Sequence, residues 1–168
     1  FFFFIYYPCV PLRPHFSFCF IFMQLIVADE THTGIVAEML AALFEEVEHT
    51  PDAEEIASIF NEIEEDDHHS TLLALDDDGD PAGVITVVES LSLYAGGYIG
   101  VINELYVAPA YRSEGVGKML LDAVKELAEE REWKRLKLTT PGDEYEKTLR
   151  FYEREGFNRI GPRYRFIV

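Results

Sequence analysis

The sequence predicts an α+β fold, with a mixed and mostly antiparallel central sheet flanked by about four helices. Segments of alternating and of helical hydrophobic periodicity follow one another in the order β-α-α-β-β-β-α-β-α-β-β. Three consecutive strands are separated only by short turns rich in Gly and Asp, which favours antiparallel pairing. At 168 residues, the chain is long enough for one domain with a sizeable core and too short for two ordinary domains.

The first half of the ordered pattern begins with a strand at 24–28. A helix follows to about His49, with Asp29 or Thr31 as its N-cap, and Pro51-Asp52 begins a second helix. The apolar stripe of the first helix is Ile35, Val36, Met39, Leu40 and Leu43, and that of the second is Ile56, Ile59, Phe60 and Ile63.

The three consecutive strands are predicted at 71–75, 83–93 and 99–107. The connection at 76–81 consists of Asp, Gly and Pro residues, which are typical of a turn, and Gly96-Gly97 marks the second turn. The C-terminal part is predicted to contain helices at 118–131 and 143–155 and strands at 135–139, 157–160 and 163–168. Gly156 suits the C′ position after the last helix, and Gly161-Pro162 lies between the closing strands.

The composition restricts the partners. The net charge is −17, which argues against nucleic acid or an anionic membrane as the main partner, because phosphate binding needs clustered cations. A cationic substrate agrees better with this charge, and an alternative is that the acidic surface serves solubility alone.

The first 22 residues differ from the rest, since they hold many aromatic residues and prolines and a single charged residue, Arg13. They match neither a signal peptide nor a membrane span. We expect residues 1–22 to lie outside the fold, with Met23 as the true start, and residues 23–168 to form a single domain. A hydrophobic arm on a partner subunit is the alternative.

Both cysteines, Cys9 and Cys19, lie in this first segment. Residues 23–168 therefore have no structural disulfide, no zinc-cysteine site and no acyl-cysteine intermediate. This composition suits a cytoplasmic protein.

An Arg-x-x-Gly-x-Gly sequence, from Arg112 to Gly117, stands between a predicted strand and a predicted helix. Its glycines fall at a helix N-terminus, where main-chain N–H groups without intrahelical partners and the helix dipole bind anions. A helix start without a ligand also explains two glycines. A dinucleotide fingerprint does not fit, because Leu120 takes the place of its third glycine, and a P-loop does not fit, because Met119 follows Lys118.

Two segments carry a family resemblance. Residues 103–117 read Asn-Glu-Leu-Tyr-Val-Ala-Pro-Ala-Tyr-Arg-Ser-Glu-Gly-Val-Gly, and residues 149–157 read Leu-Arg-Phe-Tyr-Glu-Arg-Glu-Gly-Phe. In this order they resemble the acyl-CoA pyrophosphate segment and the Phe-Tyr-x-x-x-Gly-Phe helix end of the GNAT superfamily of N-acyltransferases. The resemblance extends over nearly all of residues 23–168. Tyr145 departs from it, because members often carry Asn there, so one side-chain contact to the cofactor is in doubt.

The resemblance implies that an acetyl group moves from acetyl-CoA to a primary amine by direct attack. It implies that main-chain groups of Leu105 and Val107 pair with the pantetheine arm, and that the pyrophosphate lies over the loop that follows. The implied N–H donors are those of Arg112, Glu114, Gly115, Val116, Gly117 and Lys118. Arg112 and Lys118 add positive charge, whereas Glu114 has to turn its side chain to solvent. Similar proteins often form homodimers.

Glu104 is the candidate general base. Its neighbours Val101, Ile102, Leu105 and Val107 suggest burial on both faces of the strand, and burial raises the pKa of a carboxyl group. In the GNAT family a Glu on this strand often takes the proton of the amine. The structural alternative is a carboxylate paired with an Arg or Lys on an adjoining element, and both interpretations stay open.

Tyr152 matches the family's tyrosine beside the thioester sulfur, so the resemblance implies that it acts as the general acid for the leaving thiolate. An ordinary tyrosine pKa near 10 keeps it protonated at neutral pH. The alternative is that Phe151 and Tyr152 are core aromatics near a helix end.

Two other clusters are weaker candidates. Residues 66–69, Asp-Asp-His-His, lack further ligands at suitable spacing, so we predict a solvated loop and no metal site. Glu45, Glu46, Glu48 and His49 could meet an amine or form an ordinary helix surface. The predicted function is an N-acetyltransferase that acts on a small-molecule or peptide amine, and the alternative is a non-catalytic acyl-CoA-binding or interaction module.

Overall fold

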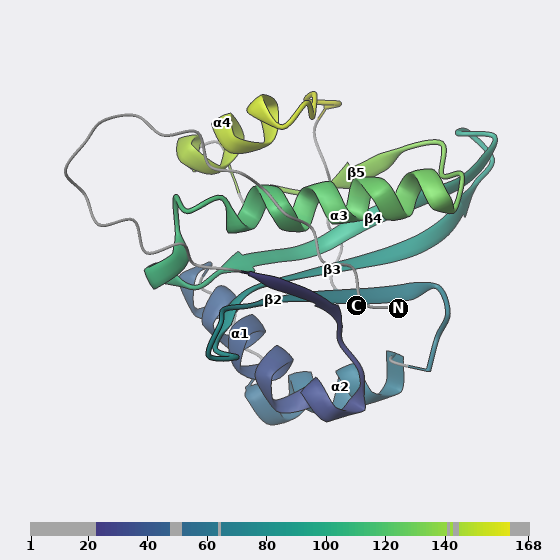
Figure 1. The fold of residues 1–168 in the computed structure, drawn as a ribbon. Coiled ribbons are helices and arrows are strands. Elements are labelled where there is room, and N and C mark those ends of the chain that lie inside the picture. The colour runs from purple at the N-terminus through teal and green to yellow at the C-terminus, as the bar shows by residue number, and fades with distance from the viewer. Residues whose placement is uncertain (1–22, 48–51, 64, 141, 143–144, 162–168) are drawn as a thin grey trace. The chain divides into compact units, whose positions relative to one another are not determined.

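The structure is a computed structural model and describes residues 23–47, 52–63, 65–140, 142 and 145–161 (Figure 1). The chain divides into two compact units, of which the first ends at Leu138 and the second begins at Thr139. The predicted segment at 1–22 and the predicted strand at 163–168 lie outside the described residues.

The first unit contains a five-stranded sheet in the order β1-β2-β3-β4-β5. Its strands are β1 Gln24–Val27, β2 His69–Leu75, β3 Pro81–Ser92, β4 Gly97–Val107 and β5 Leu136–Leu138. Neighbouring strands from β1 to β4 are antiparallel, whereas β5 runs parallel to β4. This confirms the predicted mixed and mostly antiparallel sheet.

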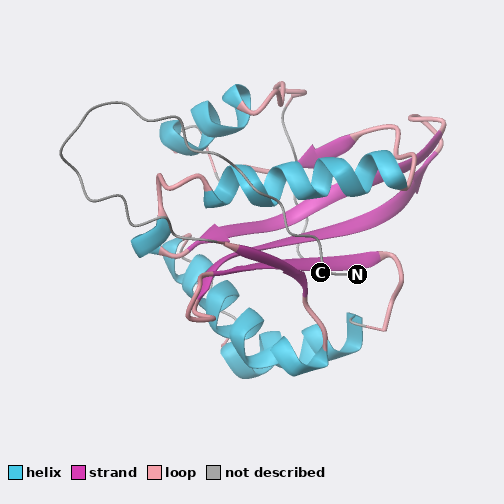
Figure 2. Cartoon of the chain, viewed as in Figure 1, coloured by secondary structure: helices cyan, strands magenta, loops and turns pink. Residues whose placement is uncertain are grey.

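The helices of the first unit lie on both faces of this sheet, with α1 and α2 on one face and α3 on the other (Figures 1 and 2). They are α1 Thr33–Glu46, α2 Ala53–Ile63 and α3 Val116–Glu130, and the short 3-10 helices η1 Glu30–His32 and η2 Pro109–Tyr111 precede α1 and α3. Within the described part of the chain, none of the helices is long and apolar enough to cross a bilayer.

Short polar side chains begin η1 and α2. Asp29 accepts the N–H of Thr31 at 2.9 Å and caps η1, so Asp29 and not Thr31 is the cap of the first helical segment, while α1 follows η1 without a side-chain cap of its own. Asp52 accepts the N–H of Glu55 at 2.8 Å at the start of α2. The first helix ends at Glu46, earlier than the predicted end near His49, because the N–H of Val47 turns back to the carbonyl of Phe44.

The larger core lies between the sheet and the two helices α1 and α2. Its buried residues include Val36, Ala37, Met39, Leu40, Ile56, Phe60, Leu73, Val84 and Tyr106. On the other face, Val116, Leu120, Leu121 and Val124 of α3 are buried. Gly83 of β3 lies under the first turns of α3, where an added Cβ would stand 2.9 Å from Val116 and from Leu120. The missing side chain therefore lets the start of α3 approach the sheet closely.

Gly100 provides a test of the packing between β4 and β5. An added Cβ there would overlap the ring of Trp133 and lie 2.7 Å from Leu136. We expect Gly100→Ala to lower the free energy of unfolding by about 1–3 kcal/mol through overpacking. Gly34→Ala on α1 is the matched control, because open space surrounds that position and alanine favours a helix by about 1 kcal/mol. Urea unfolding of both variants measures the difference, and equal stabilities would contradict this packing.

The second unit contains α4 Glu146–Arg154. The N–H of Phe157 bonds the carbonyl of Tyr152 at 3.0 Å, and the N–H of Gly156 bonds that of Glu153 at 3.1 Å. With Gly156 at φ 90°, this is a Schellman motif, which confirms Gly156 at the C′ position. The strand predicted at 157–160 is wrong, since these residues have no regular secondary structure. The N–H of Phe157 closes the helix end instead of joining a strand pair.

Candidate active site

A β-bulge in β4 marks the centre of the site. Ile85 pairs with Leu105 and Val87 pairs with Ile102, so Asn103 and Glu104 together stand opposite Thr86. A bulge of this kind redirects side chains and increases the local twist, and bulges are frequent beside active sites. The sequence analysis placed Glu104 in a regular strand and did not anticipate the bulge, because an extra residue in one strand appears only when the partner's register is known.

The carboxyl group of Glu104 contacts Thr86 across this bulge. The Thr86 hydroxyl donates a hydrogen bond to Oε2 of Glu104. The main-chain N–H of Glu104 donates to Oγ1 of Thr86 at 3.2 Å. Burial raises the pKa of Glu104, and the hydrogen bond from Thr86 opposes this rise. Among the described residues, no Lys, Arg or His forms an ion pair with Glu104.

The main chain of β4 after the bulge has one open edge in the described part of the first unit. β5 pairs with β4 only at Gly100–Ile102. The N–H of Ala108 bonds the carbonyl of Ala82 at 3.0 Å, so by antiparallel alternation the main-chain groups of Leu105 and Val107 point away from β3. This is the edge that the predicted pantetheine pairing requires, and the pairing itself stays a prediction.

Residues 112–118, which we name the anion-binding loop after their predicted role, connect η2 to the first turn of α3. Ser113 has φ 70° and Gly115 has φ 90°, and α3 begins with the N–H of Met119 bonded to the carbonyl of Gly115 at 3.0 Å. Within the described residues, the main-chain N–H groups of Gly115, Val116 and Gly117 have no acceptor. Exposed N–H groups at a helix N-terminus, next to left-handed residues, form a concave site for an anion.

Two of the predicted N–H donors already have acceptors. The N–H of Arg112 bonds the carbonyl of Pro109 at 3.4 Å, and that of Glu114 bonds the carbonyl of Tyr111 at 3.4 Å. Both bonds are long, so they compete weakly with a phosphate oxygen. The side chain of Glu114 is exposed, as its place beside an anion requires.

The two cationic side chains of the loop are paired within the protein. Arg112 forms an ion pair with Glu46 of α1, donates from Nε to the carbonyl of Val107 at 2.9 Å, and stacks on the ring of Tyr106. Lys118 pairs with Asp122 one turn further along α3. The predicted attraction of a pyrophosphate to these side chains therefore requires both to change partners, whereas the N–H groups at the start of α3 are already available.

Tyr152 stands on α4 in the second unit. Its ring centroid is 5.2 Å from that of Phe151 and 5.9 Å from that of Phe157. Burial raises the pKa of Tyr152 to about 12, so the phenol stays protonated at neutral pH. The first unit brings together Glu104, Leu105, Val107 and the anion-binding loop, and the approach of Tyr152 to the thioester stays a prediction.

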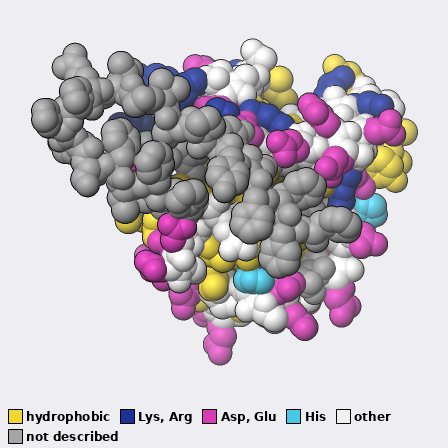
Figure 3. Space-filling model, viewed as in Figure 1, with side chains coloured by type: hydrophobic (Ala, Val, Ile, Leu, Met, Phe, Trp, Pro, Cys, Tyr) yellow, Lys and Arg dark blue, Asp and Glu magenta, His cyan; other side chains and the backbone are white. Residues whose placement is uncertain are grey.

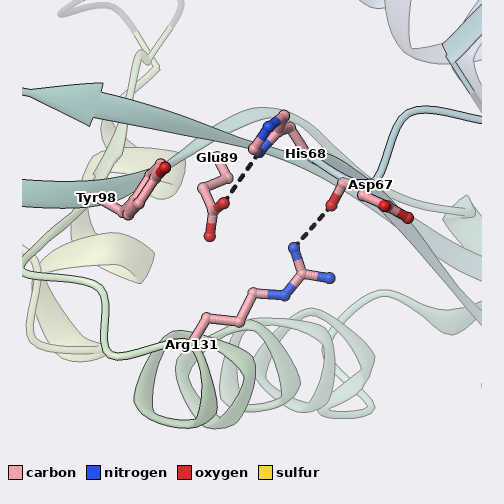
Figure 4. Close-up of a pocket in the computed structure, with 5 residues that line it drawn as sticks. All are labelled: Asp67, His68, Glu89, Tyr98 and Arg131. Carbon is pink, nitrogen blue, oxygen red and sulfur yellow. Dashed lines mark hydrogen bonds and ion pairs between the residues drawn. The ribbon is translucent and has the colours of Figure 1, made fainter.

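A hollow of about 460 Å³ at the other end of β4 is a rival location (Figure 4). Asp67, His68, Glu89, Tyr98 and Arg131 line it. Its charged groups contact one another, because Glu89 bonds His68 at 3.0 Å and also the indole of Trp133, and Arg131 bonds the carbonyl of Asp67 at 2.9 Å. These contacts join the end of α3 to the sheet, and we assign the hollow a structural role.

The sequence analysis did not identify three residues that contact Glu104, α3 or the start of the anion-binding loop. Thr86 contacts Glu104, Gly83 lies under α3, and Tyr111 bonds Asp76 in the turn between β2 and β3. Tyr111 precedes Arg112 directly, so its place beside the loop was a usable signal. The contacts of Thr86 and Gly83 depend on register and helix packing, which the sequence pattern does not carry.

The fold and the candidate site agree with one class of protein, the acyltransferases: a mixed sheet has helices on both faces, and main-chain N–H groups without acceptors in the described part of the chain follow its fourth strand at the start of α3. The sequence profile of the acetyltransferase (GNAT) family matches residues 33–157. The chain therefore belongs to this family, as predicted from residues 103–117 and 149–157, and it is an acyltransferase of the kind that uses acetyl-CoA.

Solved structures agree with the fold. An aminoglycoside N-acetyltransferase in complex with CoA matches with a TM-score of 0.76 and 18% identity, over 94% of this chain and 99% of that one. A ribosomal-protein-alanine N-acetyltransferase from Brucella melitensis biovar Abortus 2308 matches with a TM-score of 0.72 and 21% identity, over 87% of this chain and 99% of that one. An acetyltransferase from Trypanosoma brucei matches with a TM-score of 0.70 and 24% identity, over 87% of this chain and 99% of that one. The comparison with curated proteins gave no match.

Proposed function

We propose that this protein transfers an acetyl group from acetyl-CoA to a primary amine by direct attack, with Glu104 as general base and Tyr152 as general acid. The observation that carries the proposal is the half-buried carboxyl group of Glu104 at the bulge of β4, on the same strand that leads into the anion-binding loop. A carboxyl group with a raised pKa is a better proton acceptor than an ordinary one.

The proposed reaction divides its tasks among a few groups. Acetyl-CoA supplies an activated thioester. Main-chain N–H groups of the anion-binding loop bind its pyrophosphate, and the edge of β4 at Leu105 and Val107 orients its pantetheine arm. The amine attacks the thioester carbonyl and gives a proton to Glu104, directly or through water. The C–S bond breaks, and Tyr152 gives its proton to the leaving thiolate, so the products are an N-acetylated amine and free coenzyme A.

The acceptor is proposed to be cationic. The net charge of −17 attracts ammonium groups, and acidic side chains are scattered over the face that Figure 3 shows. A cationic amine must lose a proton before it attacks, which agrees with a general base in the site. The cytoplasm is the proposed location, because residues 23–168 contain no cysteine.

A panel of amines tests the function. Wild-type protein and acetyl-CoA are mixed with a polyamine, an aminoglycoside and a peptide with an N-terminal alanine, and released coenzyme A is measured as free thiol. Amine-dependent thiol release above the hydrolysis rate supports the enzyme. Tight acetyl-CoA binding without turnover of any amine would favour the alternative, a non-catalytic acyl-CoA-binding module.

Tyr152→Phe tests the general acid. We expect kcat to fall on the order of 10- to 100-fold, because the leaving thiolate loses its proton donor, while the Kd for acetyl-CoA stays within about twofold. Stopped-flow turnover and calorimetry measure the two quantities separately. Unchanged turnover would remove Tyr152 from the mechanism and leave it as a packing residue between Phe151 and Phe157.

A further inference from the structure

The anion-binding loop is held at its beginning by a contact that the reaction itself does not use. Tyr111 is the last residue of η2, directly before Arg112. Its hydroxyl donates a hydrogen bond of 2.5 Å to Oδ2 of Asp76, in the turn between β2 and β3. A short bond from a phenol to a carboxylate belongs to the stronger class of hydrogen bonds.

The Asp76 side of this contact is fixed in advance. Its Oδ1 accepts the N–H groups of Asp78 at 3.0 Å and Asp80 at 2.9 Å. Its main-chain N–H bonds the carbonyl of Asp80 at 2.9 Å, and the N–H of Gly79 bonds the carbonyl of Asp76 at 3.0 Å. These hydrogen bonds hold the turn in one conformation, and they leave Oδ2 of Asp76 to accept the hydroxyl of Tyr111.

The contact persists over the working range of pH. The Tyr111 hydrogen bond, with those from the turn, lowers the pKa of Asp76. The same bond raises the pKa of Tyr111 to about 12. Asp76 is therefore ionised and Tyr111 protonated at neutral pH, which is the combination that the hydrogen bond needs.

The charge of the turn argues that its role is positional. It carries four carboxylates, Asp76, Asp77, Asp78 and Asp80. Such a turn, in contact with the residue that begins an anion site, repels the ligand by its charge. Any contribution of the contact to anion binding therefore comes from geometry and not from charge.

The loop needs such a restraint. Ser113 adopts φ 70°, which is strained for a residue with a side chain, and the available N–H groups at the start of α3 converge only while this conformation is kept. The loop is fixed at its far end by α3, whose first turns rest on Gly83. Tyr111 fixes its near end.

We infer that Tyr111 and Asp76 are positioning residues that hold the anion-binding loop in its binding shape before the acyl-CoA pyrophosphate arrives. This inference rests on the proposed function of the loop. Neither side chain is expected to touch the reacting atoms, so the pair sets the affinity for acetyl-CoA and not the rate of the chemical step.

Tyr111→Phe and Asp76→Asn test the pair. The first removes only the hydroxyl. The second keeps one oxygen for the turn but presents to Tyr111 an amide N–H₂, which cannot accept from the hydroxyl and can only donate a weaker, neutral hydrogen bond to it. We expect each variant to raise the Kd and KM for acetyl-CoA roughly 10-fold with kcat within about twofold of wild type. The double variant should resemble the single ones, because both changes remove the same hydrogen bond from the phenol to a charged carboxylate.

Tyr94→Phe is the matched control, since Tyr94 is 85% exposed in the hairpin between β3 and β4. It should leave Kd and KM unchanged. Hydrogen exchange followed by mass spectrometry gives a readout that does not need activity: amides of residues 113–118 should exchange faster in Tyr111→Phe and in Asp76→Asn than in wild type or Tyr94→Phe.

The outcomes separate the two proposals. If wild type binds and turns over acetyl-CoA while Tyr111→Phe matches Tyr94→Phe in Kd and in loop exchange, the positioning role is wrong and the enzyme stands. If wild type binds no acetyl-CoA, the proposed function fails, and loop exchange in the variants still decides whether Tyr111 and Asp76 restrain the loop. A fall in kcat by as large a factor as the rise in KM would also overturn the inference, because the pair would then affect the chemical step as well as binding.

Discussion

Replacing Gly117 with valine is expected to abolish measurable binding of acetyl-CoA. Gly117 is the second residue of α3, and its main-chain N–H has no acceptor among the described residues. The methyl groups of valine would stand where a phosphate oxygen has to approach this N–H and that of Val116. Loss of two hydrogen bonds to a charged group costs about 3 kcal/mol or more, and hence at least about 100-fold in Kd.

Gly34→Val is the matched control for this variant. Gly34 is also the second residue of a helix, α1, and open space surrounds it. Both variants make the same change in helix propensity, so thermal unfolding should shift similarly, and only Gly117→Val should lose heat of binding in calorimetry with acetyl-CoA. Retention of tight binding by Gly117→Val would show that the cofactor binds elsewhere.

The sequence could predict this part of the site because its signal is local. A strand, a proline, two glycines and an amphipathic helix are consecutive, and each has its own pattern in the residues from 99 to 131. The order β2 to β4 follows equally from consecutive hairpins, whereas β1 pairs with β2 across the intervening helices α1 and α2. What short-range patterns predicted, the described residues largely confirm.

The parts that were missed depend on the pairing of distant residues. The bulge at Asn103 and Glu104 is a register shift against β3, and Thr86 becomes the partner of Glu104 only through it. Arg112 was predicted from the motif as a phosphate ligand, but the structure pairs it with Glu46, 66 residues away. The strand predicted at 157–160 was wrong, and the N–H groups of Gly156 and Phe157 instead close the end of α4.

Glu104→Gln is expected to lower kcat/KM on the order of 1000-fold, within the range for loss of a general base. The glutamine keeps the shape of the side chain and an oxygen for the Thr86 hydroxyl, so the bulge should persist. In wild type, both Glu104 and the amine must lose a proton before the reaction. A plot of log(kcat/KM) against pH should therefore approach a slope of about 2 at low pH. In the variant only the amine titrates, so the slope should be about 1.

The stability of the same variant should move in the opposite direction to its activity. Burial raises the pKa of Glu104 above its ordinary value of 4.5. Below pH 4.5 the group is protonated in both folded and unfolded chains, whereas at higher pH it ionises more readily in the unfolded chain, which lowers the stability of the fold. Glu104→Gln removes this penalty, so the variant should be more stable than wild type at pH 7 and equal to it near pH 4.

Glu89→Gln is the matched control, because Glu89 is also a poorly exposed glutamate, on β3 at the far end of the sheet. Its pKa is lowered, chiefly by the hydrogen bond from Trp133, so its charge stabilises the fold above the ordinary pKa of 4.5 and this stability is lost as pH falls through the folded value. Glu89→Gln should therefore be less stable at neutral pH but as active as wild type. If Glu104→Gln keeps the activity of wild type, as Glu89→Gln should, Glu104 is a structural carboxyl group and the base must be sought elsewhere.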